Sequence, residues 1–198
     1  MKTLGLELSS ARGSIALLED GRSLFATEFP NDRKHSGLFF ESLQRCVDDF
    51  GTPQRIVVGL GPGSYAGTRI AIAAAIGLGI ACRASLIGLP SFCTLPANTQ
   101  RYAVVGDARR QAFFFAVVDE RRCLEGPMLY SFADLDARLA TVGCPVFSAE
   151  ALPQFPNVTI MSPSALVLAQ LASHEPVSLV ALEPIYLRDP HITAPRVL

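Results

Sequence analysis

Residues 59–70 decide the fold, and they read Gly59-Leu60-Gly61-Pro62-Gly63-Ser64-Tyr65-Ala66-Gly67-Thr68-Arg69-Ile70. An apolar run, Arg55 to Leu60, leads into this segment, and a long run of small apolar residues follows it. Glycines allow positive φ angles and the close approach of another backbone. The first N–H groups of a helix that begins here would be free to bind an anion. The pattern predicts a buried strand, a tight turn and a helix, as in an α/β fold.

Two common nucleotide-binding loops do not fit this segment. Residues 61–66 match the dinucleotide pattern G-x-G-x-x-A, but that site needs an acidic residue about 20 positions further on. The sequence contains no Asp or Glu between Phe50 and Gly106. A phosphate-binding P-loop needs a lysine after its last glycine, and none occurs near this segment. A purely structural role, in which the turn brings a helix of small residues close to its strand, stays open.

Hydrophobic periodicity on both sides of this loop predicts the other elements. In the first half we expect strands at Thr3–Leu8, Ser14–Leu18, Ser23–Glu28, Arg55–Leu60 and Ser85–Gly88, with helices at Ser36–Phe50 and from the loop to Cys82. In the second half we expect strands at Tyr102–Gly106, Gln111–Val118, Pro127–Ser131 and Pro145–Ser148, with helices at Phe132–Ala140 and Pro163–Ser173. Ser131 and Ser162 are the expected N-caps of those two helices. The helix that ends at Cys82 is apolar on every face, so it must be covered on all sides, either by its own domain or by another subunit.

Acidic residues occupy matching places in the two halves of the chain. Glu7 ends the first strand, and a turn and a second strand follow it. Asp107 stands in the same relation to the strands of the second half. We therefore predict two α/β units, residues 1–100 and residues 101–198, each beginning with an antiparallel meander. The end of the chain is expected to pack back on the first unit.

Composition excludes several classes of protein. The chain has 198 residues, of which 49% are hydrophobic and 18% charged, and its formal net charge is -1. These values exclude a wholly disordered chain and give no uniformly basic surface for nucleic acid. The five cysteines form no C-x-x-C pair, which indicates buried free thiols in a reducing compartment rather than a disulfide framework or a zinc site. With no signal peptide and no apolar run long enough for a bilayer, we expect a cytoplasmic protein without a membrane segment.

Four segments of the sequence resemble the bacterial TsaB (YeaZ) family. The run from Gly61 to Ile70 is similar to the glycine-rich signature of that family. The opening Leu4 to Ser10, the run Asp107 to Arg110 and the terminal Pro184 to Arg188 resemble three further family segments in order and spacing. The resemblance spans nearly the whole chain. It implies the ASKHA (actin/Hsp70/sugar-kinase) fold, an α/β architecture of two subdomains with mixed β-sheets flanked by helices.

The resemblance also implies partners. Proteins of this family pair with their paralogue TsaD, which transfers the threonylcarbamoyl group that forms threonylcarbamoyladenosine next to the anticodon of tRNA; the ATPase TsaE joins the complex. On this basis the chain is a non-catalytic scaffold that meets tRNA through the complex and forms homodimers when alone. Its partner interface would lie on the helices at residues 36–50 and 69–82. The expected contact residues are His35, Leu38, Phe39, Leu43, Arg69, Ile70, Ala73, Ala74 and Gly77.

A vestigial nucleotide cleft is the second site that the resemblance implies. In related ATPases a carboxylate at the end of the first strand serves a metal-bound water, and Glu7 and Asp107 stand at the two matching positions. Two acids facing one another across a cleft could hold Mg²⁺ through water. The expected cleft residues are Glu7, Ser9, Ser10, Gly61, Gly63, Ser64 and Asp107. ATP or ADP with Mg²⁺ would bind in this cleft or at the partner interface, while the complex as a whole uses ATP.

The histidines favour a non-catalytic subunit. TsaD-type proteins bind a metal through an H-x-x-x-H pair, because histidines one helical turn apart face the same ion. Here His35, His174 and His191 have no such spacing, so we expect neither a metal site nor a catalytic residue. Two alternatives stay open. One is a stand-alone ASKHA-type ATPase or small-molecule kinase, which needs intact phosphate loops in both halves; the other is a homodimeric interaction protein unconnected with tRNA.

Overall fold

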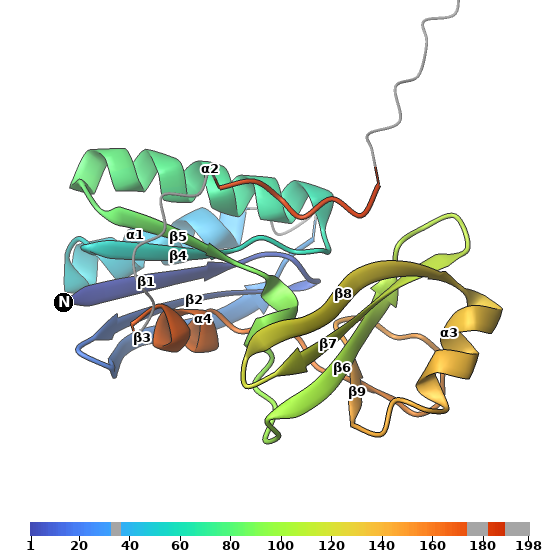
Figure 1. Ribbon diagram of the computed structural model, residues 1–198. Helices are drawn as coiled ribbons and strands as arrows, with labels where there is room; N and C mark the ends of the chain where they lie inside the picture. Colours follow the sequence, from blue (N-terminus) through green and yellow to red (C-terminus); the bar gives the residue numbers. More distant parts are fainter. Residues whose placement is uncertain (33–36, 174–181, 189–198) are drawn as a thin grey trace, which may run out of the picture.

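Two five-stranded sheets form the framework of the molecule (Figure 1). The computed structural model describes residues 1–32, 37–173 and 182–188. Strand order is β3-β2-β1-β4-β5 in the first sheet and β10-β9-β6-β7-β8 in the second. In each sheet three strands form an antiparallel meander, a fourth strand pairs in parallel with the first strand of the meander, and a fifth pairs in parallel with the fourth. The second sheet therefore repeats the topology of the first, which confirms the predicted ASKHA-like α/β class.

The bounds of the elements agree with the predicted ones to within a few residues, apart from two strands. The first sheet and its helices are β1 (Lys2–Glu7), β2 (Arg12–Glu19), β3 (Arg22–Pro30), α1 (Gly37–Phe50), β4 (Arg55–Gly59), α2 (Tyr65–Cys82) and β5 (Ser85–Leu89). A short 3-10 helix, η1 (Ser91–Thr94), leads to the second half. There follow β6 (Arg101–Asp107), β7 (Ala112–Asp119), β8 (Arg122–Ser131), α3 (Phe132–Leu139), β9 (Val146–Ser148), β10 (Val158–Ile160) and α4 (Ala165–Ala172). β8 is longer than predicted, and β10 was not predicted.

Side chains of the first sheet alternate between two cores because successive residues of a strand point to opposite faces. Leu4, Leu6 and Val58 lie on the face that α1 and α2 cover. Val57 and Ile87 lie on the other face, against α4. Figure 1 shows these three layers, with α1 and α2 on one side of the sheet and α4 on the other.

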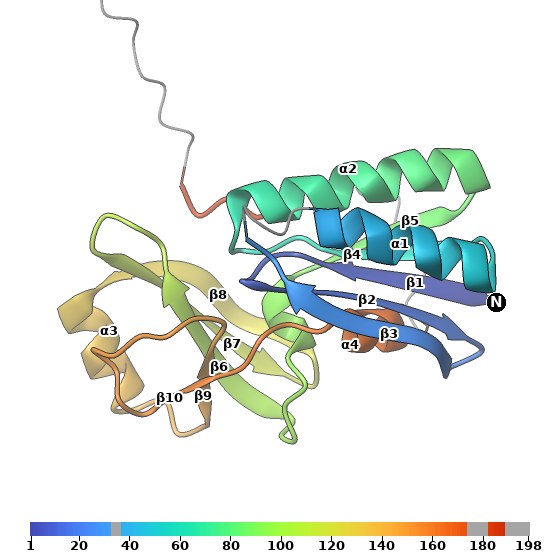
Figure 2. The same cartoon turned by 180° about the vertical axis from the view of Figure 1, so that it is seen from behind.

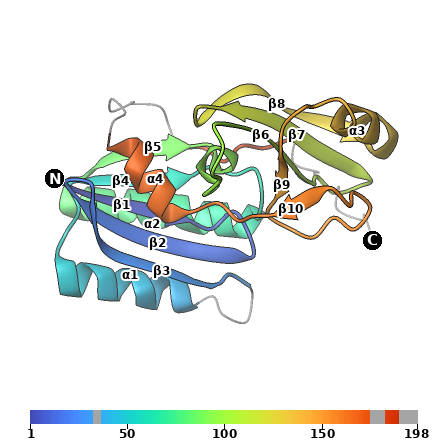
Figure 3. The same cartoon turned by 90° about the horizontal axis from the view of Figure 1, so that it is seen from below.

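Helix α4 belongs spatially to the first sheet although it follows the second sheet in sequence (Figure 3). The N–H of Ala165 donates a 2.9 Å hydrogen bond to the hydroxyl of Ser14 in β2. Arg55, at the start of β4, donates to the carbonyl of Ala172 at the other end of α4. The N-cap is Ser164, without a side-chain hydrogen bond, which corrects the predicted cap at Ser162. The second half of the chain thus supplies one layer of the first.

The second sheet is covered differently on its two faces (Figure 2). Leu135 of α3 packs on one face, among residues of β6 and β7. The opposite face packs against η1 and the residues after it, and also against Ile185 and Leu187 from near the end of the chain. Residues 182–188, called the strap below, begin at the first sheet, where Leu182 packs against the core under α2. The strap therefore joins the two sheets.

Helix α2 is covered on one side only. Its buried residues are Gly67, Thr68, Ala71, Ile72, Ala75 and Gly79. Ile70, Ile76 and Ile80 are exposed on the other side, and Ile80 keeps 75% of its surface accessible. By length and composition α2 is able to cross a membrane, a test that core helices also pass, and 33% of it is buried here. The predicted cover on all sides is not found within the described part of this chain.

Candidate functional site

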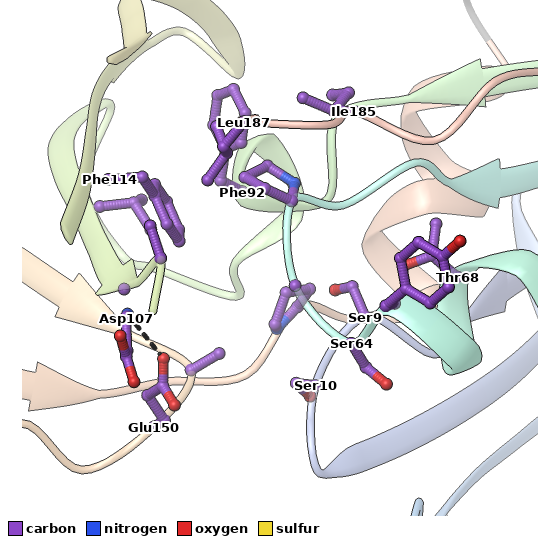
Figure 4. A pocket seen from close by; sticks show the side chains of 18 of the residues that line it. Ser9, Ser10, Ser64, Thr68, Phe92, Asp107, Phe114, Glu150, Ile185 and Leu187 are labelled. Carbon is purple, nitrogen blue, oxygen red and sulfur yellow. Dashed lines mark hydrogen bonds between the residues drawn. The ribbon is translucent and has the colours of Figure 1, made fainter. Parts of the chain in front are cut away.

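A cavity of about 580 Å³ lies between the two sheets, next to the turn after β1 and the end of β6 (Figure 4). Polar groups of the first half lie on one side of it, and charged groups of the second half lie on the other. Its polar lining includes Ser9, Ser10, Asn31, Ser64, Thr68, Asp107, Arg109, Glu150 and Arg188. Its apolar lining includes Phe92, Leu95, Val104, Phe114, Ile185 and Leu187.

The glycine-rich loop is pressed against the turn that follows β1. The N–H of Ser64 donates a 2.6 Å hydrogen bond to the carbonyl of Ser9. A Cβ on Gly63 would lie 2.1 Å from that same carbonyl oxygen, so only glycine allows this approach. The hydroxyl of Ser64 accepts a hydrogen bond from the N–H of Gly67 and so caps α2. These contacts give the loop a structural role, because they join the helix to the first hairpin.

Asp107 lies on the opposite wall, and its carboxylate forms an ion pair with Arg109. Oδ2 is 3.2 Å from Nη1 of Arg109, and Oδ1 accepts a 2.6 Å hydrogen bond from the N–H of Arg109. The N–H of Asp107 donates a 2.8 Å hydrogen bond to Oε1 of Glu150, drawn as a dashed line in Figure 4. Three residues of the adjoining turn, Arg109, Arg110 and Gln111, have positive φ angles of 64°, 53° and 59°. A turn that carries side chains at these positions leaves less room for a phosphate than glycines would.

Glu7 does not face Asp107 across the cavity. It is fully buried beneath the glycine-rich loop, where Oε1 accepts a 2.6 Å hydrogen bond from the N–H of Ser9. Its Oε2 has no hydrogen-bond partner among the described residues. Burial raises the pKa of Glu7, and hydrogen bonding to Ser9 offsets this only in part. A raised pKa favours the neutral acid, which is a poor ligand for a divalent cation.

The predicted cleft is therefore corrected at two residues. The structure brings Ser9, Ser10, Gly63, Ser64 and Asp107 together around the cavity. Glu7 and Gly61 are buried and do not line it, because Glu7 points into the core at the end of β1 and Gly61 is hydrogen-bonded to Ser91 of η1. No group of three or more His, Cys, Asp or Glu in residues 1–32, 37–173 and 182–188 could hold a metal ion.

Sequence reasoning missed Glu150 and the strap as parts of this site. Glu150 lies between β9 and β10 in a stretch without hydrophobic periodicity, and the fold alone brings it to the N–H of Asp107. The strap has no helix or strand, although the terminal motif from Pro184 to Arg188 was a signal in the sequence. All five of those residues line the cavity.

The predicted partner interface on α1 is also corrected. Phe39 and Leu43 are buried, with 3% and 9% of their surface exposed, and they pack in the core between α1 and the first sheet. Leu38 is half-buried against that core. The apolar spacing that predicts helix α1 marks the side facing its own sheet, so the same residues cannot face a partner. Phe40, which was not predicted, is 54% exposed.

On α2, four predicted contact residues do share the uncovered side. Arg69, Ile70, Ala73 and Gly77 are exposed, whereas Ala74 is half-buried against the core. With Ala66, Ile76 and Ile80, these four residues form a continuous stripe, called the docking stripe below. Nothing lies within 4 Å of a Cβ built on Gly77, so this part of the stripe is open. His35, the remaining predicted contact, lies outside the described residues.

Arg69 is a cation without a carboxylate partner among the described residues. Its guanidinium lies 4.8 Å from the ring centroid of Tyr65, and it donates to the hydroxyl of the same tyrosine. The first turn of α2 contains no acidic residue. Since the N-terminal end of a helix carries partial positive charge, a cation there is unfavourable unless a negative group lies nearby.

Comparison with known proteins identifies the family. A family model for TsaD, tRNA N6-adenosine threonylcarbamoyltransferase, matches residues 31–140. The uncharacterized proteins Mb3455c of Mycobacterium bovis and Rv3421c of Mycobacterium tuberculosis are each 33% identical to this chain over 138 residues, which is 68% of the chain. The match spans 64% of the length of those relatives.

Solved structures agree with this assignment at the level of the fold. YeaZ from Pseudomonas aeruginosa matches with a TM-score of 0.71 and 21% identity over 87% of this chain and 91% of its own. An uncharacterized protein with similarity to peptidase YEAZ from Pseudomonas aeruginosa matches with a TM-score of 0.74 and 20% identity, over 94% of this chain and 99% of its own. The chain therefore belongs to the TsaD family of tRNA N6-adenosine threonylcarbamoyltransferases and has the fold of the TsaB (YeaZ) proteins.

Proposed function

We propose that this chain is a non-catalytic subunit that pairs with a TsaD-type paralogue in forming threonylcarbamoyladenosine next to the anticodon of tRNA. The observation that carries the proposal is the uncovered docking stripe of α2, on a helix whose other side is packed in a complete core. The matching family model is that of a tRNA N6-adenosine threonylcarbamoyltransferase, which supports tRNA as the substrate of the complex.

The docking stripe suits a closely packed helix of a partner. Ala73 and Gly77 are one turn apart and small, so another backbone can approach them. Ile70, Ile76 and Ile80 flank these small residues and would supply the apolar area. Burying such side chains contributes roughly 1.5–3 kcal/mol each when the burial is complete. A second copy of this chain could use the same stripe, so we expect homodimers when the paralogue is absent.

The cavity supports a non-catalytic role. The two acids predicted to hold a metal together do not face one another. Glu7 is buried away from the cavity, and Asp107 forms an ion pair with Arg109. We therefore assign ATP use to the complex, with a TsaE-type ATPase as a further member, and contact with tRNA to the assembled complex. A chain with these partners works in the cytoplasm. ATP or ADP with Mg²⁺ remains a candidate ligand of the cavity, held by its hydroxyl and backbone groups rather than by a pair of acids.

Reconstitution tests this function. Unmodified tRNA is incubated with the TsaD-type paralogue, the other components and ATP, with and without this chain, and threonylcarbamoyladenosine is measured by mass spectrometry of the digested tRNA. Modification that depends on this chain, and that survives Asp107→Asn, supports a scaffold. Turnover of ATP by the chain alone, lost in Asp107→Asn and without any effect on the tRNA, would instead establish a stand-alone ATPase or kinase.

A further inference from the structure

The strap is fixed to both halves of the molecule by specific contacts. The N–H of Ile185 donates a 2.8 Å hydrogen bond to the carbonyl of Leu60, at the start of the glycine-rich loop. Leu182 packs in the core of the first sheet, and Ile185 and Leu187 pack in the core of the second. In Figure 1 the strap runs from beside α2 toward the second sheet. It is therefore one of the segments that set the position of the two sheets relative to one another.

Tyr186 lies between Ile185 and Leu187 in the strap, and its ring contacts the first turn of α2. Its ring lies 5.9 Å from the ring of Tyr65, in the first turn of that helix. Tyr65 is in turn the ring on which the guanidinium of Arg69 lies. Tyr186 is 47% exposed and Tyr65 is 60% exposed. These three side chains form one exposed row that joins the strap to the N-terminal end of the docking stripe.

The same strap forms a wall of the cavity. Residues 184–188 all line it, and Figure 4 places Ile185 and Leu187 at its edge, near Phe92. A movement of the strap would therefore change the cavity, the docking stripe and the relation of the two sheets together.

We propose that the strap is part of the partner-docking surface, and that a partner bound there holds the strap closed over the cavity. This inference rests on the proposed function, because the occupant is the TsaD-type chain. A complementary partner segment would carry a carboxylate opposite Arg69 and apolar side chains against the rings of Tyr65 and Tyr186. A carboxylate is expected because the first turn of α2 contains no acidic residue to offset the charge of Arg69.

Coupling of this kind is reciprocal. If docking favours the closed strap, a closed strap must also favour docking by the same factor. Loss of the Tyr186 ring weakens both the contact with the partner and the contact with Tyr65. The amide of Ile185 reports the state of the strap, since its hydrogen bond to Leu60 breaks whenever the strap opens.

Hydrogen exchange followed by mass spectrometry tests this inference on the full chain, alone and with the TsaD-type paralogue. The variants are Tyr186→Ala and, as a control, Phe132→Ala, which removes an aromatic ring of similar exposure (48%) on α3. In the wild-type complex we expect exchange to slow both in α2 and at residues 182–188. We expect Tyr186→Ala to weaken the complex about tenfold, an effect of the size found when a tyrosine at an interface hot spot is truncated, and Phe132→Ala to change it less than about twofold.

The outcomes separate this inference from the proposed function. Slower exchange in α2 with no change at residues 182–188, or a Tyr186→Ala variant that binds as tightly as wild type, overturns the role of the strap while pairing through α2 stands. The absence of any complex with the wild-type chain overturns the proposed function and this inference with it.

Discussion

Gly5 of β1 lies directly beneath the carbonyl oxygen of Ala165 in α4, so close that a Cβ at residue 5 would be 2.2 Å from that oxygen. Helix α4, which follows the second sheet in sequence, thereby packs on the first strand of the first half. The hydrogen bond from Ala165 to Ser14 fixes the same end of the helix. The two halves are therefore joined by backbone contact as well as by side chains.

Gly5→Ala should destabilise the protein by about 1–3 kcal/mol, because the added methyl group meets backbone that must shift. Urea unfolding of the two proteins measures this difference. Gly77→Ala is the matched control: a Cβ there meets nothing within 4 Å, and replacing a helical glycine should stabilise by roughly 1 kcal/mol. Equal unfolding midpoints for Gly5→Ala and wild type would show that α4 does not sit on β1 in this way.

Glu7→Gln should change how stability depends on pH. Burial raises the pKa of Glu7 in the folded protein above the ordinary value of 4.5, which it keeps in the unfolded chain. Between those two pKa values the unfolded chain has lost the proton and the folded protein keeps it, so wild type loses stability as pH rises from about 4.5. The neutral glutamine has no such loss. The free energy of unfolding of Glu7→Gln minus that of wild type should therefore be larger at pH 7 than at pH 5.

Urea unfolding at the two pH values measures that difference. The slope reaches at most about 1.4 kcal/mol per pH unit for one group. A stability difference between Glu7→Gln and wild type that is the same at pH 5 and pH 7 would mean that Glu7 titrates alike in the folded and unfolded chains.

The cysteines should differ in reactivity toward iodoacetamide. Burial raises the pKa of Cys46 to about 11 and that of Cys93 to about 12. Both thiols are therefore protonated and enclosed at pH 8, and the thiolate is the reactive form. Cys123 is exposed, contrary to the expectation of buried thiols, and should be alkylated before Cys46 and Cys93. Peptide mapping after short labelling of the native protein checks this order, and labelling of Cys46 as fast as Cys123 would contradict it.

Arg69→Glu should weaken pairing with the TsaD-type paralogue by about tenfold or more, because a charge-reversed residue would face the proposed carboxylate. Titration calorimetry at low and high salt measures the effect, which should be larger at low salt because ions screen exposed charges. Arg110→Glu, on the turn between β6 and β7, is the matched control and should leave pairing unchanged. An Arg69→Glu variant that binds as wild type at low salt would remove the case for an acidic partner segment.

The elements of the fold follow from local patterns in the sequence, but the placement of several of them does not. Alternation and helical spacing predict β1 to β7, and Ser131 predicts the start of α3, where its hydroxyl accepts from the N–H of Asp134. The short strand β10 carries no such pattern, since two of its three residues are exposed. The position at which α4 packs on the first sheet depends on Gly5 and Ser14, which lie far from the helix in sequence.

The site was predictable where the sequence carries a motif, and less so where the fold decides which way a side chain points. The glycine-rich loop and Asp107 do meet at one cavity, as expected. Glu7 ends β1 as predicted, yet the pleat of the strand turns its carboxylate into the protein. On α1 the apolar residues that predict the helix are those that face its own sheet, so Phe39 was mistaken for a contact and Phe40 was overlooked.

The most direct test of the account is the mass of the complex between this chain and the TsaD-type paralogue, measured by size exclusion with light scattering for wild type and Ala73→Arg. Ala73 is exposed in the middle of the docking stripe, so an arginine there leaves the subunit folded but places a charge in the interface. Ala137→Arg, at an exposed position of α3, is the control. We expect a heterodimer for wild type and Ala137→Arg, and separate subunits for Ala73→Arg. A heterodimer of unchanged mass with Ala73→Arg would contradict it.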